Sequence, residues 1–189
     1  MATPRPDPGR TWSGLLEANR VSAQPPNGYP THRPDAVVVC CSDARVPPSF
    51  VFDRPAGSLF VVRAAGHALG PEGIASIDYA VTALAVPLVV VLGHTDCGVA
   101  HAAVGGNEPW YLAPLVEPLG VLTETHPEAG VDDIVRANVV RTMEVLGAHG
   151  GPTGTAIRAR TVAVRGGVYD LRTGLVTPVE ADLAVWTDA

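Results

Sequence analysis

Two apolar runs, at residues 36–40 and 88–93, each end in a short cluster of chemically active side chains. The clusters contain two thiols, an imidazole and an acid-base pair, namely Cys41, Asp43, Arg45, His94 and Cys97. Thiolate and imidazole are preferred ligands of zinc, and three protein ligands leave the fourth tetrahedral position open, as in catalytic zinc sites. The pattern therefore predicts one Zn²⁺ per chain, held by Cys41, His94 and Cys97.

The apolar runs are typical of buried strands in a parallel sheet. Ligands of such sheets bind in the crevice beyond the carboxyl ends of the strands, so both clusters are expected to meet in one site. His94 and Cys97 have the spacing to chelate a metal from one tight turn, while Cys41 arrives from a neighbouring strand.

Helical and strand-like segments alternate along the rest of the chain. We expect strands at residues 36–40, 59–62, 88–92, 161–168 and 175–179, and helices at residues 11–20, 47–52, 71–85, 98–104 and 131–148. Residues 105–130, which contain several glycines and prolines, show no clear periodicity. The alternation predicts an α/β fold with a mainly parallel β-sheet core flanked by helices.

The N-terminal segment differs in composition from the rest. Its first 35 residues contain 7 of the 18 prolines and one helical stretch, so they have little to pack against by themselves. We expect residues 1–35 to form a partly helical arm that lies on a partner subunit. Residues 36–189 are expected to form a single zinc-binding α/β catalytic domain, since 189 residues suit one sizeable core.

Composition excludes several classes of function. The formal net charge is -6, and all 13 basic residues are arginines that do not cluster, so we expect no nucleic-acid partner. The apolar stretches are too short to cross a membrane, and the N-terminus lacks the order of charged and apolar residues found in secretory signals. Three cysteines do not make a disulfide framework. These features predict a cytoplasmic protein without a membrane partner.

Four motifs in the first half of the chain resemble the β-class carbonic anhydrases. They are Cys41-x-Asp43-x-Arg45, residues 60–66, residues 76–81, and Gly93-His94-x-x-Cys97-Gly98. The motifs occur in family order with family-like spacing, which is far more specific than any one of them alone. The resemblance implies zinc-dependent reversible hydration of carbon dioxide to bicarbonate and a proton. It also implies a homodimer or a multiple of dimers.

The resemblance assigns roles to individual residues. Cys41, His94 and Cys97 become the metal ligands, and Asp43 and Arg45 become the catalytic dyad. An apolar substrate pocket is implied at the dimer interface, and its expected residues are His32, Phe60, Ala65, His67, Tyr79 and Gly98. Without the resemblance, Phe60 and Tyr79 would be read as core aromatics.

Two of these pocket positions depart from the family pattern. His32 stands where the family commonly carries Gln, and His67 stands where it commonly carries Asn. Histidine also donates hydrogen bonds, but it titrates near neutral pH. His32 as a proton shuttle and His32 as a weakness in bicarbonate binding are both open, and the departure bears on rate more than on reaction type.

The expected chemistry follows from the metal. Zinc lowers the pKa of bound water, so a hydroxide that attacks carbon dioxide forms near neutral pH. Two thiolates cancel the formal charge of Zn²⁺ and acidify that water less than three imidazoles would, which predicts an alkaline pH optimum. The planar fork of Arg45 is suited to holding the Asp43 carboxylate away from the metal, as a gate that closes on acidification. A plain surface ion pair is the simpler alternative.

Three other functions would use some of the same residues. A related zinc hydrolase would act on carbon disulfide or carbonyl sulfide, and a non-catalytic relative would bind zinc only. A redox or sulfur-transfer protein would use Cys40 and Cys41, although we expect Cys40 to pack in the core. Asp96 is expected to cap the helix that begins near Gly98, and His101 and His149 to lie at the surface or at helix ends.

Overall fold

The computed structural model describes residues 7–23, 31–106 and 109–181, and the chain divides into two units, residues 1–31 and 32–189. The first unit holds one helix, α1 (Pro8–Ser22), whose first turn is capped by Asp7. The Asp7 carboxylate accepts a hydrogen bond from the Arg10 N–H at 3.0 Å. The predicted helix at residues 11–20 is confirmed and extends further at both ends. The division at residue 35 and the docking of the arm on a partner stay predictions.

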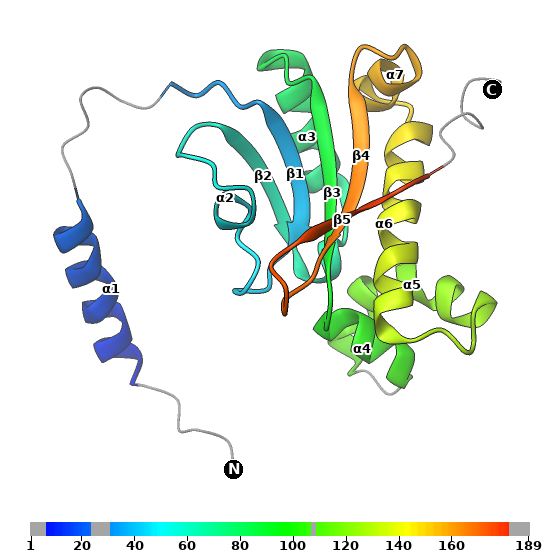
Figure 1. Cartoon of the computed structure of the whole chain (residues 1–189), viewed down its shortest axis with the longest axis horizontal. Coiled ribbons are helices and arrows are strands. Elements are labelled where there is room, and N and C mark those ends of the chain that lie inside the picture. The colour runs from blue at the N-terminus through cyan, green and yellow to red at the C-terminus, as the bar shows by residue number, and fades with distance from the viewer. Residues whose placement is uncertain (1–6, 24–30, 107–108, 182–189) are drawn as a thin grey trace. The chain divides into compact units, whose positions relative to one another are not determined.

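A five-stranded sheet forms the centre of the second unit (Figure 1). Its strands, in the spatial order β2-β1-β3-β4-β5, are β2 (Leu59–Ala64), β1 (Ala36–Cys41), β3 (Leu88–His94), β4 (Ala163–Tyr169) and β5 (Val176–Val179). The first four run parallel, and only β5 is antiparallel to its neighbour. All six residues of β1 are buried, as expected for an inner strand covered on both faces. The predicted mainly parallel α/β fold is confirmed.

The order of the strands places a topological switch point between β1 and β3. The chain leaves β1 to form β2 on one side, then crosses to form β3 on the other side of β1. In the register, Cys41 pairs with Ala64 of β2, and Cys40 pairs with Leu92, two residues before His94. The carboxyl ends of β1 and β3 therefore lie side by side at the point where the direction of winding changes, which is where open α/β sheets bind ligands.

Helices cover the sheet and link its strands. They are α2 (Pro48–Val51), α3 (Pro71–Ala83), α4 (Gly98–Gly105), α5 (Ala113–Thr125), α6 (Val131–Ala148) and α7 (Pro152–Arg158), with short 3₁₀ turns η1 (Ala65–His67) and η2 (Trp110–Leu112). Helix α6 packs over β3 and β4, and α7 joins it to α3 (Figure 1). A Cβ at Gly93 would lie 2.8 Å from the Val135 side chain, so glycine in β3 is what permits this close approach.

Two helices were not predicted. Helix α5 lies in the segment without clear periodicity, where Pro114 occupies the first turn and Pro118 lies inside the helix. Proline inside a helix removes one backbone hydrogen bond, so its presence argues against a helix from sequence alone. Helix α7 is short and begins at Pro152, directly after the predicted stop of the preceding helix. No helix among the described residues is long and apolar enough to cross a membrane.

Candidate metal centre

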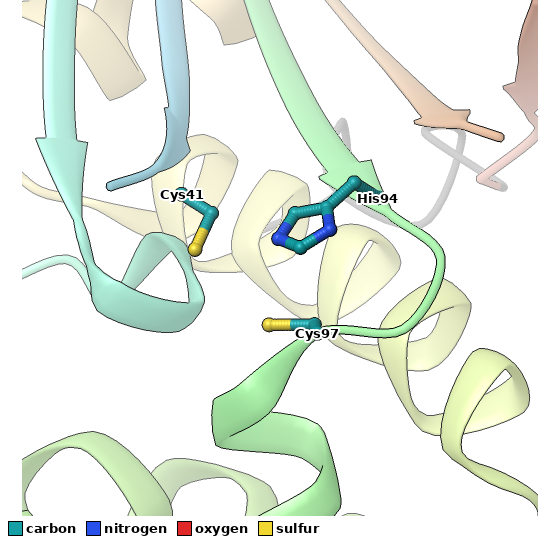
Figure 2. Close-up of side chains that lie close together, drawn as sticks. All are labelled: Cys41, His94 and Cys97. Atoms are coloured by element: carbon teal, nitrogen blue, oxygen red, sulfur yellow. The ribbon is translucent and has the colours of Figure 1, made fainter. Parts of the chain in front are cut away.

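Three buried side chains converge at the carboxyl end of the sheet. Cys41 ends β1, His94 ends β3, and Cys97 is the N-cap residue of α4. They are 5%, 1% and 3% exposed, and their donor atoms all lie within 4.8 Å of one another. Figure 2 shows the two sulfurs and the imidazole facing a common point. The structure therefore brings together the three predicted ligands in a geometry suited to one metal ion.

The orientation of His94 leaves one ring nitrogen free for that ion. Its Nδ1–H donates a hydrogen bond to the Thr95 carbonyl oxygen at 2.8 Å, so Nε2 carries the lone pair. Within the described residues, this Nε2 is the only buried side-chain nitrogen or oxygen that has no hydrogen-bond partner. Buried polar atoms are nearly always paired, so an orphaned imidazole nitrogen beside two thiols fits a metal ligand.

The two sulfurs are prepared to carry negative charge. The Cys41 Sγ accepts hydrogen bonds from the Gly66 N–H at 3.2 Å and the Asp43 N–H at 3.4 Å. The Cys97 thiol beside it lowers the pKa of Cys41, and the pKa of Cys97 is raised because a second thiolate would face the first. Burial opposes the charged form of His94, but the Cys41 sulfur, the Thr95 carbonyl oxygen and the Asp43 carboxylate together outweigh burial and raise its pKa. A divalent cation removes this conflict between charges, so the donor set fits Zn²⁺.

A tight turn behind Cys41 fixes the amide that binds its sulfur. Gly66 in η1 has a φ of +62°, and a Cβ there would lie 2.8 Å from the Val99 side chain, so the position requires glycine. The Asn138 Nδ2 donates hydrogen bonds to the Gly66 carbonyl oxygen at 3.2 Å and to the His67 Nε2 at 2.8 Å. Asn138 of α6 therefore ties this turn to the helix that covers the sheet.

His67 is enclosed by this arrangement. Its side chain is 3% exposed, and burial lowers its pKa to about 4. The ring is therefore neutral at pH 7, with Nε2 as an acceptor. Sequence analysis does not single out Asn138, an amide among the buried residues of the helix predicted for residues 131–148.

Asp43 and Arg45 lie beside the three ligands, on their exposed side. The Arg45 Nε donates to the Asp43 Oδ1 at 3.0 Å, and its NH2 donates to the Asp43 Oδ2 at 2.7 Å. This fork lowers the pKa of Asp43 to about 2, and it raises the pKa of Arg45. The Asp43 Oδ2 lies 4.0 Å from the His94 Nε2. The ion pair is therefore formed within reach of the metal position.

Arg63 of β2 supports the same loop and was not singled out from the sequence. Its Nε donates to the Cys41 carbonyl oxygen at 2.9 Å, and its NH2 donates to the Asp43 carbonyl oxygen at 2.7 Å. Arg63 thus holds the backbone from which both a ligand and the acid of the ion pair project. A guanidinium bound to two carbonyls is a tertiary contact that leaves no mark in the local sequence.

The predicted helix cap at Asp96 is wrong. Cys97 is the N-cap residue of α4, and no side chain caps that helix. The Asp96 carboxylate instead accepts hydrogen bonds from the Arg45 NH1 at 3.1 Å and from the His101 Nε2 at 2.8 Å. A charged guanidinium and an imidazole are stronger partners for a carboxylate than the amides of one helix turn. His101 lies at the surface, as predicted.

The six predicted pocket residues fall into two groups in one chain. His32, Phe60 and Tyr79 form an aromatic row with ring centroids 6.3 and 6.2 Å apart. Phe60 pairs with Val37 near the start of β1, so the row lies toward the opposite end of the sheet from the metal ligands. The other three are nearer the ligands: Ala65 and His67 lie in η1, and Gly98 begins α4. Their joint role in a substrate pocket stays a prediction.

Cys40 lies in the core with no exposed surface. Burial raises the pKa of its thiol to about 11, although Arg63 acts in the opposite direction. A thiol of this kind is a poor nucleophile at neutral pH. The prediction that Cys40 packs in the core is confirmed.

Comparisons with known proteins agree with this geometry. Residues 36–176 match the family described as carbonic anhydrase. Carbonic anhydrase 2 of Mycobacterium tuberculosis is 35% identical over 90% of this chain and 92% of its own. The carbonic anhydrase of Mycolicibacterium smegmatis is 33% identical over 92% of this chain and 94% of its own.

Solved structures show the same fold. The β-carbonic anhydrase CafA of Aspergillus fumigatus has a TM-score of 0.77 at 25% identity, covering 94% of this chain and 92% of its own. The tetrameric β-carbonic anhydrases of Sordaria macrospora include one with a TM-score of 0.74 at 24% identity, covering 92% of this chain and 93% of its own. With its Cys-His-Cys group at the strand ends, the chain belongs to the carbonic anhydrase family, in its β class, whose members use zinc.

Proposed function

We propose that this chain catalyses the reversible hydration of carbon dioxide to bicarbonate and a proton, with Asp43 and Arg45 acting as a gate beside the zinc ligands. The observation that carries the proposal is the orphaned Nε2 of His94, buried between two thiols and 4.0 Å from a carboxylate. Relatives named carbonic anhydrase that align over more than nine tenths of their length support the same reaction.

The residues divide the work between holding the metal and controlling the carboxylate. When bound, zinc supplies a water of lowered pKa and hence a nucleophilic oxygen at neutral pH. Cys41, His94 and Cys97 would hold the ion. Asp43, with a pKa of about 2, is ionised throughout the physiological range and serves as a hydrogen-bond acceptor that orients the attacking group.

Arg45 decides which side the Asp43 carboxylate faces. While the fork is formed, both Asp43 oxygens are bound by the guanidinium. If the fork breaks, the carboxylate would be free to turn toward Cys41, His94 and Cys97 and act as a further protein donor, which would close the site. Arg45 is at 50% side-chain exposure and Asp43 at 19%, so water can reach the guanidinium and replace its partners when the pair opens.

We further propose that the active unit is a homodimer or a multiple of dimers. In the structure, β2 is an edge strand, and Val61 and Tyr79 are exposed on its side of the sheet. An uncovered edge of this kind favours association with another chain. A partner there would bring its row of His32, Phe60 and Tyr79 toward the metal centre of the first chain, where the substrate pocket is expected. A cytoplasmic location stays a prediction.

The test measures zinc content and stopped-flow hydration of carbon dioxide on the purified chain. We expect one zinc per chain and a rate that rises toward alkaline pH. Arg45→Ala should lower kcat about 10- to 100-fold, as loss of a residue that orients the groups around a metal does. Arg45 and Arg172 both line an open hollow of about 640 Å³, but Arg172 does not contact Asp43. Arg172→Ala is therefore the matched control. It should keep the wild-type rate.

Three results would contradict the proposal in whole or in part. A chain that binds zinc but does not hydrate carbon dioxide would be a zinc-binding relative only. Turnover of carbon disulfide or carbonyl sulfide in place of carbon dioxide would assign a different substrate to the same ligands. Full activity in Arg45→Ala would remove the gate while leaving the reaction intact.

A further inference from the structure

Arg45 is held by two carboxylates, and only one of them belongs to the proposed gate. One edge of the guanidinium binds both oxygens of Asp43. On the other side, its NH1 donates to the Asp96 Oδ2 at 3.1 Å and its NH2 donates to the Asp96 carbonyl oxygen at 3.3 Å. The guanidinium thus lies between two acids, so Asp96 contributes to its orientation.

Asp96 is itself built into the fold from three sides. Its φ of +58° is in the left-handed region, which Asp and Asn tolerate better than most residues. Its N–H donates to the Asp132 Oδ1 at 3.0 Å, in the first turn of α6. Its Oδ1 binds the His101 Nε2 of α4 at 2.8 Å. Contacts to two helices and a constrained backbone give Asp96 a defined position from which to hold Arg45.

We propose that Asp96 is a positioning residue that keeps Arg45 in the orientation that binds Asp43, and thereby keeps Asp43 off the metal. This inference rests on the proposed gate. Without Asp96, water replaces the second partner of the half-exposed guanidinium. The guanidinium then spends more time away from Asp43. The Asp43 carboxylate, 4.0 Å from the His94 Nε2, then becomes available as a fourth protein donor.

The proposal predicts that substitution of Asp96 slows the release of zinc, whereas the simpler effects of the same substitution predict faster release. Removing the negative charge of Asp96 weakens the attraction for a cation, so charge alone predicts faster loss of zinc. A locally loosened structure also releases its metal faster. Additional ligation by Asp43 slows the release. Slower loss of zinc therefore separates the positioning role from a merely electrostatic or structural one.

The experiment follows zinc release from the zinc-loaded full chain to an excess of chelator at pH 7.5. Asp96→Gly removes the carboxylate and suits the positive φ, and Asp96→Asn keeps an uncharged acceptor. We expect release about two- to fivefold slower in Asp96→Gly, the effect of an exposed ion pair, and a smaller slowing in Asp96→Asn. Asp133→Asn is the matched control: it removes one charge from the same hollow without touching Arg45, so release should not slow.

Two further variants separate failure of this inference from failure of the gate. Arg45→Ala should slow release at least as much as Asp96→Gly does, and adding Asp43→Asn to Asp96→Gly should abolish the slowing. If Arg45→Ala slows release and Asp96→Gly does not, the role of Asp96 is overturned and the gate stands. If neither variant slows release, the gate and the role of Asp96 fall together.

Discussion

The metal centre has two unlike sides. On one, Gly66, His67 and Asn138 are buried, and Asn138 binds the other two through hydrogen bonds. On the other, Arg45 and Asp96 are 50% and 62% exposed and bind through ion pairs. The buried side contacts the Cys41 sulfur through the Gly66 N–H, and the exposed side contacts the Asp43 carboxylate through Arg45.

The contrast indicates a division between fixing the ligands and adjusting the fourth position. Buried hydrogen bonds that lose a partner leave an unsatisfied polar group and carry a large penalty. Exposed ion pairs exchange with water at little cost. Changes on the buried side should therefore alter stability and metal binding, and changes on the exposed side should alter the reaction with little effect on stability.

The largest effect, a loss of zinc affinity, is expected from substitution of a candidate metal ligand. Cys41→Ser should lower the affinity for zinc by more than about 100-fold, which exceeds the usual loss when only a supporting residue is removed. Competition with a chelator of known affinity measures this change. Cys40→Ala is the matched control, because adjacent side chains of a strand lie on opposite faces of the sheet, so the Cys40 thiol should be replaceable with full retention of zinc.

On the buried side, Asn138→Ala should lower the free energy of unfolding by about 2–4 kcal/mol. The substitution leaves the Gly66 carbonyl oxygen and the His67 ring without their donor. Denaturant unfolding of the zinc-loaded protein tests it. Glu144→Gln, on the exposed face of the same helix, should change stability by less than about 0.5 kcal/mol. Equal changes in the two variants would contradict the contrast.

The same side should give the protein a specific sensitivity to acid. The pKa of His67 is lowered from 6.5 to about 4, so between these values the unfolded chain binds a proton that the folded chain does not. Stability is therefore unaffected above pH 6.5, falls as the pH drops below it, and has lost about 3 kcal/mol by pH 4. His67→Asn should flatten this part of the stability curve, as seen in unfolding midpoints at a series of pH values.

On the exposed side, Arg45→Ala should have the smallest effect on stability. The Arg45 side chain is half exposed, so the ion pairs that the substitution removes contribute little, and the unfolding midpoint should match that of the wild type within error. The hydration rate of the same sample should nevertheless fall. A large loss of stability in Arg45→Ala would show that the two sides do not differ in the way the exposure of their residues indicates.

The sequence predicted the ligands better than their supports. His94 and Cys97 lie in one short turn and Cys41 ends another strand, so local spacing and strand ends together indicate all three as candidate ligands. Asn138, Arg63 and Asp96 act through contacts made across the fold, 71, 22 and 51 residues away from their partners. Such contacts depend on how helices pack on the sheet, which periodicity does not specify. For the same reason, Asp96 was assigned a local capping role.

Helix α6 mechanically connects the two sides. Asp132 in its first turn receives the amide of Asp96, and Asn138, less than two turns later, holds the loop behind Cys41. Inserting one residue between them would rotate one contact by about 100° relative to the other. The number of residues between Asp132 and Asn138 therefore fixes how these two contacts are oriented relative to each other. Insertions or deletions in α6 should be far less tolerated than substitutions on its exposed face.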